Sequence, residues 1–284
     1  MTLNKNSVYQ LTNGVEIPVV GFGTWQTPDG DVAQQAVLDA LTAGYRHIDT
    51  AAIYGNEVSV GQAILKSGVN REELFVTTKA WNDVHTYEDA KVALTTSLTK
   101  LGLDYVDLYL IHWPNPVAVR ENWQQRNAEL WRYFEEAYES GLVRAIGVSN
   151  FHEHHLDSLL ITAKIVPHVN QVHLSPSDMQ PAVVAANNKH QILTQAYSPL
   201  GTGTILTAPA LINIADRHQK TPAQVAIRWS LQNGYNPLPK SVTNSRIIDN
   251  IDIFDFELSA DEITTISSLS GSGNVASDPD SRGF

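Results

Sequence analysis

The chain of 284 residues, with 43% hydrophobic and 17% charged residues, can bury one sizeable core and lacks the polar bias of disordered segments. Its net charge of -11 argues against a nucleic-acid partner, because binding to phosphates requires a basic surface. The absence of cysteine excludes disulfides, zinc–thiolate sites and thiol nucleophiles. The first ten residues do not resemble a secretory signal, and no run approaches the roughly 20 apolar residues of a membrane helix. We therefore expect a cytoplasmic protein with no membrane partner.

Short apolar strands alternate with amphipathic helices from one end of the chain to the other. Residues 7–17 (SVYQLTNGVEI) come first and hold Asn-Gly between two apolar-alternating pieces, which predicts a β-hairpin. Eight strands are predicted after it. In chain order they are residues 19–21, 46–49, 75–79, 106–112, 145–148, 168–171, 192–196 and 236–239.

Apolar residues recur at helical spacing between these strands. Residues 33–41 follow this rule and end at Gly44, a typical helix stop. Thr221 and Pro222 form a cap followed by proline at the first helical position, so a helix begins there and ends near Gly234. We interpret these segments as helices that cover a sheet.

Strands connected by helices imply parallel pairing with right-handed crossovers. Eight such units, at spacings of about 30 residues, favour a closed (β/α)8 TIM barrel, an α/β fold, over an open sheet, which stays the alternative. We expect one barrel domain over residues 1–284, with the N-terminal hairpin plugging one end. The segment from Ser267, rich in Ser, Gly and Asp, predicts a loop or loose tail over about residues 268–284.

Active residues of such a barrel lie where strands end, because the loops after the strands converge on one face. A single ionisable residue at a strand end is often only structural. Together, however, Asp, Lys, Tyr and His around one mouth can transfer a proton, since tyrosine titrates near ~10 and needs a cationic neighbour to act as an acid near neutral pH. The polar residues at predicted strand ends are Asp49, Lys79, His112, Ser149, Asn150, Asn170, Gln171, Tyr197 and Lys240.

Four long segments resemble signatures of the aldo-keto reductase family. They are GYRHIDTAAIYGNE (44–57), LGLDYVDLYLIHWP (101–114), GVSNF (147–151) and PKSVTNSRIIDN (239–250). They occur in the family's order and spread over most of the chain. The passages AAIYGNE and KTPAQVAIRW look most similar to the bacterial 2,5-diketogluconate reductases of that family.

The resemblance implies NADPH-dependent reduction of small aldehydes and ketones, such as keto sugars, keto acids or methylglyoxal. It assigns the catalytic roles to Asp49, Tyr54, Lys79 and His112. Tyr54 would donate the proton to the carbonyl oxygen, and Lys79, paired with Asp49, would lower the pKa of the tyrosine. His112 would orient the carbonyl. The hydride would come from the nicotinamide, since no side chain can supply it.

The resemblance also implies where NADPH lies. The nicotinamide amide would meet Ser149, Asn150 and Gln171 and its ring would stack on Tyr197, while Lys240 and Arg246 pair with the 2′-phosphate. The residues 198–202 would close over the pyrophosphate, and Asp249 and Asn250 would touch the adenine. The full expected set is Thr24, Trp25, Asp49, Ser149, Asn150, Gln171, Tyr197, Ser198, Leu200, Gly201, Lys240, Ser241, Val242, Thr243, Arg246 and Asn250. A Rossmann site at residues 21–26 (GFGTWQ) is rejected, because the third glycine is missing.

Three tryptophans near strand ends suit an apolar pocket for a small carbonyl substrate, although each taken alone is more often core. The expected substrate-binding residues are Trp25, Trp81, Asn82, His112 and Trp113. The passage NQVHLSPS departs from the family pattern and leaves the substrate side less defined. The short C-terminal tail predicts a small, open site, and we expect a monomer.

Two other functions are compatible with parts of the sequence. A metal-dependent barrel hydrolase could use His152, His154 and His155, but these residues open a helix and are expected to diverge around it, with no strand-end carboxylate to complete the set. We therefore expect no metal. A non-catalytic NADPH-binding regulator of the same fold is the second alternative, because fold alone does not fix function.

Overall fold

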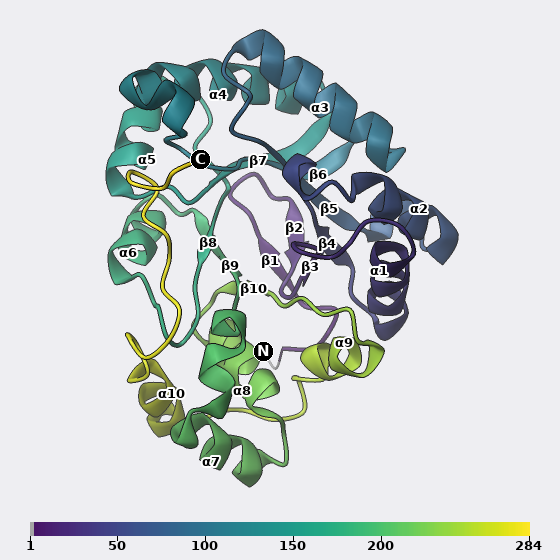
Figure 1. Cartoon of the computed structure of the whole chain (residues 1–284), viewed down its shortest axis with the longest axis vertical. Coiled ribbons are helices and arrows are strands. Elements are labelled where there is room, and N and C mark those ends of the chain that lie inside the picture. The colour runs from purple at the N-terminus through teal and green to yellow at the C-terminus, as the bar shows by residue number, and fades with distance from the viewer. Residues whose placement is uncertain (1–2) are drawn as a thin grey trace.

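The computed structural model describes residues 3–284 and shows a ring of parallel strands surrounded by helices (Figure 1). Each strand of the ring pairs in parallel with the next one along the chain. Two backbone hydrogen bonds, from Gly21 N to Pro237 O and from Gly23 N to Pro239 O, both 3.0 Å, join residues in and next to the two edge strands and close the barrel. The strands are β3 (Phe22–Gly23), β4 (His47–Asp49), β5 (Phe75–Ala80), β6 (Val106–Ile111), β7 (Val143–Ser149), β8 (Val169–His173), β9 (Leu193–Tyr197) and β10 (Asn236–Leu238).

The helices bury one apolar face each against the outside of this ring. In α1 (Asp31–Ala43) the buried positions recur at helical spacing, and Gly44 ends the helix with φ 108°, a conformation that favours glycine. Thr221 caps α8 (Pro222–Gln232) through its side chain. The other helices are α2 (Glu57–Ser67), α3 (Tyr87–Leu101), α4 (Trp123–Glu139), α5 (Glu153–Leu160), α6 (Pro181–Lys189), α7 (Pro209–His218), α9 (Asn244–Ile251) and α10 (Ala260–Ser267).

An antiparallel hairpin of β1 (Val8–Gln10) and β2 (Glu16–Pro18) covers the end of the barrel where the strands begin. Its Ile17 is fully buried and belongs to one apolar cluster with Phe75 and Leu108 from the barrel strands. The opposite end, where the strands finish, is therefore the one left for a site.

The barrel with an N-terminal hairpin is confirmed, and so are the helix boundaries at Gly44 and Thr221. The first predicted strand is wrong: it lies at Phe22–Gly23 and not at residues 19–21. Val19 and Val20 are buried apolar residues that pack into the core before the strand begins, so apolar character alone misplaced it. The other strands differ from their predicted limits by only one or two residues.

The tail after α10 has no helix or strand in the described chain, as its composition predicts, and it makes hydrogen bonds to the rest of the protein. Gly271 N donates to Ser177 O at 2.7 Å, and Val117 N donates to the terminal Phe284 O at 3.2 Å. Figure 1 shows this yellow segment running from α10 past α6 and α5. The tail is thus fastened along the face where the strands end. Within residues 3–284, none of the helices combines the length and apolar character needed to span a bilayer.

Candidate active site

A cavity of about 1220 Å³ opens at the carboxyl ends of the barrel strands. It is large enough for a dinucleotide beside a small substrate. Residues from every part of the expected site line it. Those are Trp25, Asp49, Tyr54, Trp81, His112, Trp113, Ser149, Asn150, Gln171, Tyr197, Ser198, Leu200, Lys240, Ser241, Arg246, Asp249 and Asn250.

Some expected residues do not line the cavity. Thr24 is fully buried, and its hydroxyl donates to Asp49 O at 2.9 Å, which is a structural role. Asn82 is only 7% exposed and is absent from the cavity lining. Asn170, from the strand-end search, is buried and donates to Phe151 O at 2.9 Å. The remaining cofactor residues outside the lining are Gly201, Val242 and Thr243.

Three side chains meet at the floor of the cavity. Asp49 ends β4, a short 3₁₀ turn (Ala52–Tyr54) brings Tyr54 back over it, and Lys79 reaches up from the neighbouring β5. The Lys79 ammonium donates to Asp49 Oδ1 at 2.7 Å, to Thr50 O at 2.9 Å and to the phenol oxygen of Tyr54 at 3.4 Å. Asp49 Oδ2 accepts from Gln171 Nε2 at 2.7 Å. The lysine is therefore held by acceptors on one side and faces the phenol on the other.

Burial governs the acidity of these groups. It raises the pKa of the Tyr54 phenol well above its ordinary 10.0, and the Asp49 carboxylate raises it further. Burial also lowers the pKa of Lys79 and raises that of Asp49, and their ion pair opposes both shifts. Burial and the negative charge of Asp49 thus outweigh the lowering effect expected of Lys79, and the pKa of Tyr54 in the resting site is raised overall. Tyr54 is a protonated phenol near neutral pH.

His112 follows β6 and lies beside the phenol. Its ring centre is 5.8 Å from that of Tyr54 and 5.0 Å from that of Trp81, both edge-on. Burial, followed by the charge of Lys79, holds the pKa of His112 well below its ordinary 6.5. A neutral imidazole beside a protonated phenol can donate or accept a hydrogen bond without bringing a charge to the site.

A hydrogen-bonded group of amides and hydroxyls lies next to this floor. Ser149 Oγ donates to Gln171 O at 2.7 Å, and Asn150 Nδ2 donates to His112 O at 3.0 Å. The Tyr197 hydroxyl donates to Asn150 Oδ1 at 2.9 Å, which fixes the plane of its ring. These groups offer fixed polar contacts for a carboxamide and an aromatic face for a flat ring.

The far end of the cavity is basic. Lys240 and Arg246, both exposed, line it at the start of α9, and Lys240 Nζ donates to Gln26 O at 3.3 Å. A helix N-terminus with two cations is a suitable place for a phosphate group. The donor set along the cavity, with amides at the floor and cations at the end, fits a nicotinamide dinucleotide with a phosphate group at the basic end.

The C-terminal tail supplies cavity residues that the sequence did not indicate. The Phe284 ring lies 5.5 Å from Trp81 and 5.1 Å from Trp113, centre to centre. The Arg282 guanidinium lies 4.5 Å from the Phe284 ring centre and 5.5 Å from that of Trp113. The tail therefore walls the side of the cavity near the tryptophans, which the expectation of an open site did not include. Nothing in a segment rich in Ser, Gly and Asp indicates this position.

The sequence pattern of the Aldo/keto reductase family matches residues 19–270, and the chain belongs to that family. It is therefore an oxidoreductase. The glyoxal reductase of Bacillus subtilis is 44% identical over 280 residues, 99% of either chain. The methylglyoxal reductase DkgA of Escherichia coli is 43% identical over 279 residues, 98% of either chain. An aldo-keto reductase of Bombyx mori, solved in complex with NADP, superposes with a TM-score of 0.87 at 36% identity, covering 96% of this chain and 95% of the other.

The family membership expected from the motifs is thus confirmed. None of these three names refers to 2,5-diketogluconate, so the narrower resemblance remains a prediction.

Proposed function

We propose that this protein reduces small aldehydes and ketones with NADPH and that Tyr54 gives the proton to the carbonyl oxygen. The observation that carries the proposal is the Lys79 ammonium, which lies 3.4 Å from the Tyr54 phenol oxygen and 2.7 Å from Asp49 at the floor of the cavity. An acid of this kind needs a proton at neutral pH and a way to stabilise the charge left behind. The site offers both.

Tyr54 and Lys79 act at different moments in this account. Because the pKa of Tyr54 is raised, the phenol holds its proton until a stronger base forms beside it. An alkoxide developing on the substrate is such a base. As the proton leaves, negative charge appears on the phenol oxygen, and the neighbouring ammonium stabilises it. Lys79 thus acts on the transition state rather than on the resting acid.

His112 positions the carbonyl. Being neutral, it can donate one ring N–H to the carbonyl oxygen without competing with Tyr54 as an acid. When bound, NADPH supplies the hydride. Its amide would be held by Ser149, Asn150 and Gln171, and its nicotinamide ring would stack on Tyr197. Its 2′-phosphate would pair with Lys240 and Arg246, and this contact favours NADPH over NADH, which lacks the phosphate.

Two observations support a small substrate. The tryptophans Trp25, Trp81 and Trp113 line the cavity, and Trp81 and Trp113 pack against Phe284 of the tail, so this side of the cavity is apolar and walled. Two of the similar proteins are named glyoxal reductase and methylglyoxal reductase, and the substrates in these names are small dicarbonyls. We infer that 2-oxoaldehydes such as methylglyoxal belong to the substrate class.

Oxidation of NADPH, followed by its absorbance, tests the proposal with methylglyoxal, glyceraldehyde and a diketo sugar acid as substrates. The expected result is turnover with at least one of them. Tight binding of NADPH without turnover of any would overturn the proposal and favour the non-catalytic regulator. Tyr54→Phe is the matched control, since it removes only the acidic hydroxyl.

A further inference from the structure

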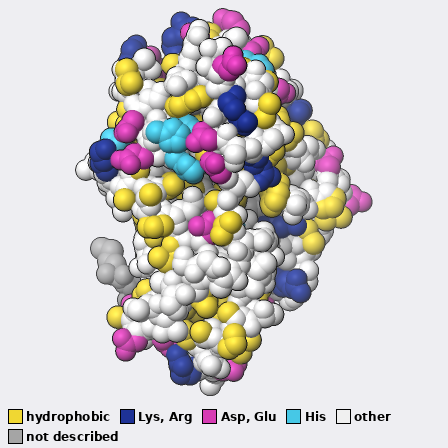
Figure 2. Space-filling model, turned by 60° about the vertical axis from the view of Figure 1, so that its left-hand side comes forward, with side chains coloured by type: hydrophobic (Ala, Val, Ile, Leu, Met, Phe, Trp, Pro, Cys, Tyr) yellow, Lys and Arg dark blue, Asp and Glu magenta, His cyan; other side chains and the backbone are white. Residues whose placement is uncertain are grey.

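Three histidines at the start of α5 gather around one carboxylate of the C-terminal tail. His152, His154, His155 and Asp280 each offer one ligand atom, and these atoms all lie within 4.8 Å of one another. The group lies on the surface, where Figure 2 shows a cyan patch of histidines with acidic side chains beside it. None of the four lines the catalytic cavity. The expectation that these histidines diverge is therefore wrong for His154 and His155, and the carboxylate comes from the tail rather than from a strand end.

One oxygen of Asp280 is fixed by buried donors. His155 Nε2 lies 3.0 Å from Oδ1, and Asn115 Nδ2 donates to the same oxygen at 2.8 Å. His155 Nδ1 accepts the backbone N–H of His152 at 3.1 Å, so its proton must sit on Nε2 and point at Asp280. The fully buried His155 is therefore a donor that orients the carboxylate, the arrangement found behind metal-binding side chains.

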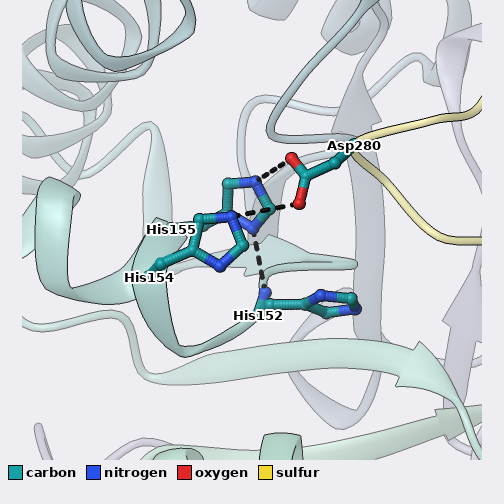
Figure 3. A group of neighbouring side chains, drawn as sticks. All are labelled: His152, His154, His155 and Asp280. Carbon is teal, nitrogen blue, oxygen red and sulfur yellow. Dashed lines mark hydrogen bonds and ion pairs between the residues drawn. The ribbon is translucent and has the colours of Figure 1, made fainter.

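The second oxygen of Asp280 faces solvent together with His154. Oδ2 lies 3.1 Å from His154 Nε2, and the two side chains are 37% and 54% exposed (Figure 3). Two ligands bound tetrahedrally to zinc at 2.0–2.1 Å are about 3.3 Å apart, so this pair already has nearly the spacing of ligands. The partly exposed His152 can complete a third position by a side-chain rotation, and water the fourth.

We propose that His152, His154 and Asp280 bind a divalent transition-metal ion, with Zn²⁺ the preferred ion. Two imidazoles and a carboxylate are a borderline-soft donor set, which suits zinc better than Mg²⁺ or Ca²⁺. Asp278 adds a second negative charge close to His152, which helps to offset the charge of the ion.

The site would connect the tail to the barrel and take no part in the reduction. Asp280 lies between Ser277 and Arg282, and both of these line the catalytic cavity, as does Phe284. A metal ion held jointly by α5 and Asp280 would therefore keep the tail in place along the tryptophan side of the cavity.

Isothermal titration calorimetry tests the proposal. Zn²⁺ alone is titrated into the purified, untagged full chain. The expected result is one site per chain with a micromolar or tighter Kd. His154→Ala and Asp280→Asn should each weaken binding at least tenfold, and His155→Ala, which removes the orienting donor, should weaken it by ~10–100-fold. Circular dichroism checks that each variant is folded.

His218→Ala is a matched control. His218 Nε2 also lies 3.1 Å from a carboxylate, that of Glu262, but it belongs to no such group of histidines. This variant should bind Zn²⁺ as the wild type does. Addition of Co²⁺ to the wild type should produce the visible absorption bands of a Co²⁺ ion bound in a low-symmetry site. The Asp280→Asn variant should not show these bands. Absence of saturable Zn²⁺ binding in the wild type, or unchanged affinity in both His154→Ala and Asp280→Asn, would overturn the proposal.

Discussion

Replacing Lys79 by methionine removes the one ammonium group next to the Tyr54 phenol while keeping a side chain of similar length. In the wild type, Lys79 Nζ and the phenol oxygen of Tyr54 are 3.4 Å apart. At an effective dielectric constant of about 20, a charge developing at that distance gains about 5 kcal/mol from the ammonium. If most of this is realised in the transition state, kcat should fall by ~10³-fold or more. NADPH binding should change little, because Lys79 lies beneath the cavity.

Lys79→Met also leaves the buried Asp49 without its cation, which can cost several kcal/mol of stability. The double variant Asp49→Asn with Lys79→Met removes both charges and keeps the test interpretable if the single variant unfolds. Lys240→Met is the control lysine, since it lines the far end of the cavity and should raise the KM for NADPH with little change in kcat. Steady-state kinetics with methylglyoxal measures kcat and the KM for NADPH of all three variants. A kcat within tenfold of the wild type in a folded Lys79 variant would refute the role given to the ammonium.

Three further predictions follow from the same geometry. Tyr54→Phe should lower kcat by ~10²–10⁴-fold with NADPH affinity nearly unchanged, and near-normal turnover would exclude Tyr54 as the acid. Arg246→Ala should weaken the binding of NADPH by ~10–100-fold and that of NADH far less, as measured by fluorescence titration. An equal loss of affinity for both cofactors would contradict the phosphate contact. Because the pKa of Tyr54 is raised, the acid stays protonated through neutral and mildly alkaline pH, so kcat for reduction should be level there, whereas a decline centred near neutral pH would contradict this assignment.

Part of the site follows from the sequence for a simple physical reason. Parallel strands of a barrel end at one face, so Asp49, Lys79 and His112 could be brought together by locating strand ends. Tyr54 could not be found in this way, because it lies in a 3₁₀ turn beyond its strand. Only the family resemblance indicated it.

Other parts of the site depend on contacts between distant segments. Phe284 packs against Trp81 and Trp113, and Val117 N donates to its carbonyl oxygen, so these contacts join positions far apart in the chain. The local sequence pattern of the tail does not predict such a contact. The direction of the overall pKa shift of Tyr54 has a similar origin, since it depends on how deeply the phenol is buried, which the sequence does not show.

The first strand shows the same limit on a smaller scale. Val19 and Val20 have the apolar character of a strand, yet they pack in the core, and the ladder with β4 starts only at Phe22. Hydrophobic pattern locates an element, while the register of its hydrogen bonds is set by the neighbouring strand.

The central claim is that the Tyr54 phenol, beside Lys79, points at the reacting carbonyl. A crystal structure of the complex with NADP⁺ and a carbonyl-containing inhibitor tests this most directly. We expect the inhibitor oxygen within about 3.2 Å of the phenol oxygen, with the nicotinamide ring against Tyr197. An inhibitor oxygen bound away from Tyr54, or a nicotinamide on another side of the cavity, would contradict the account.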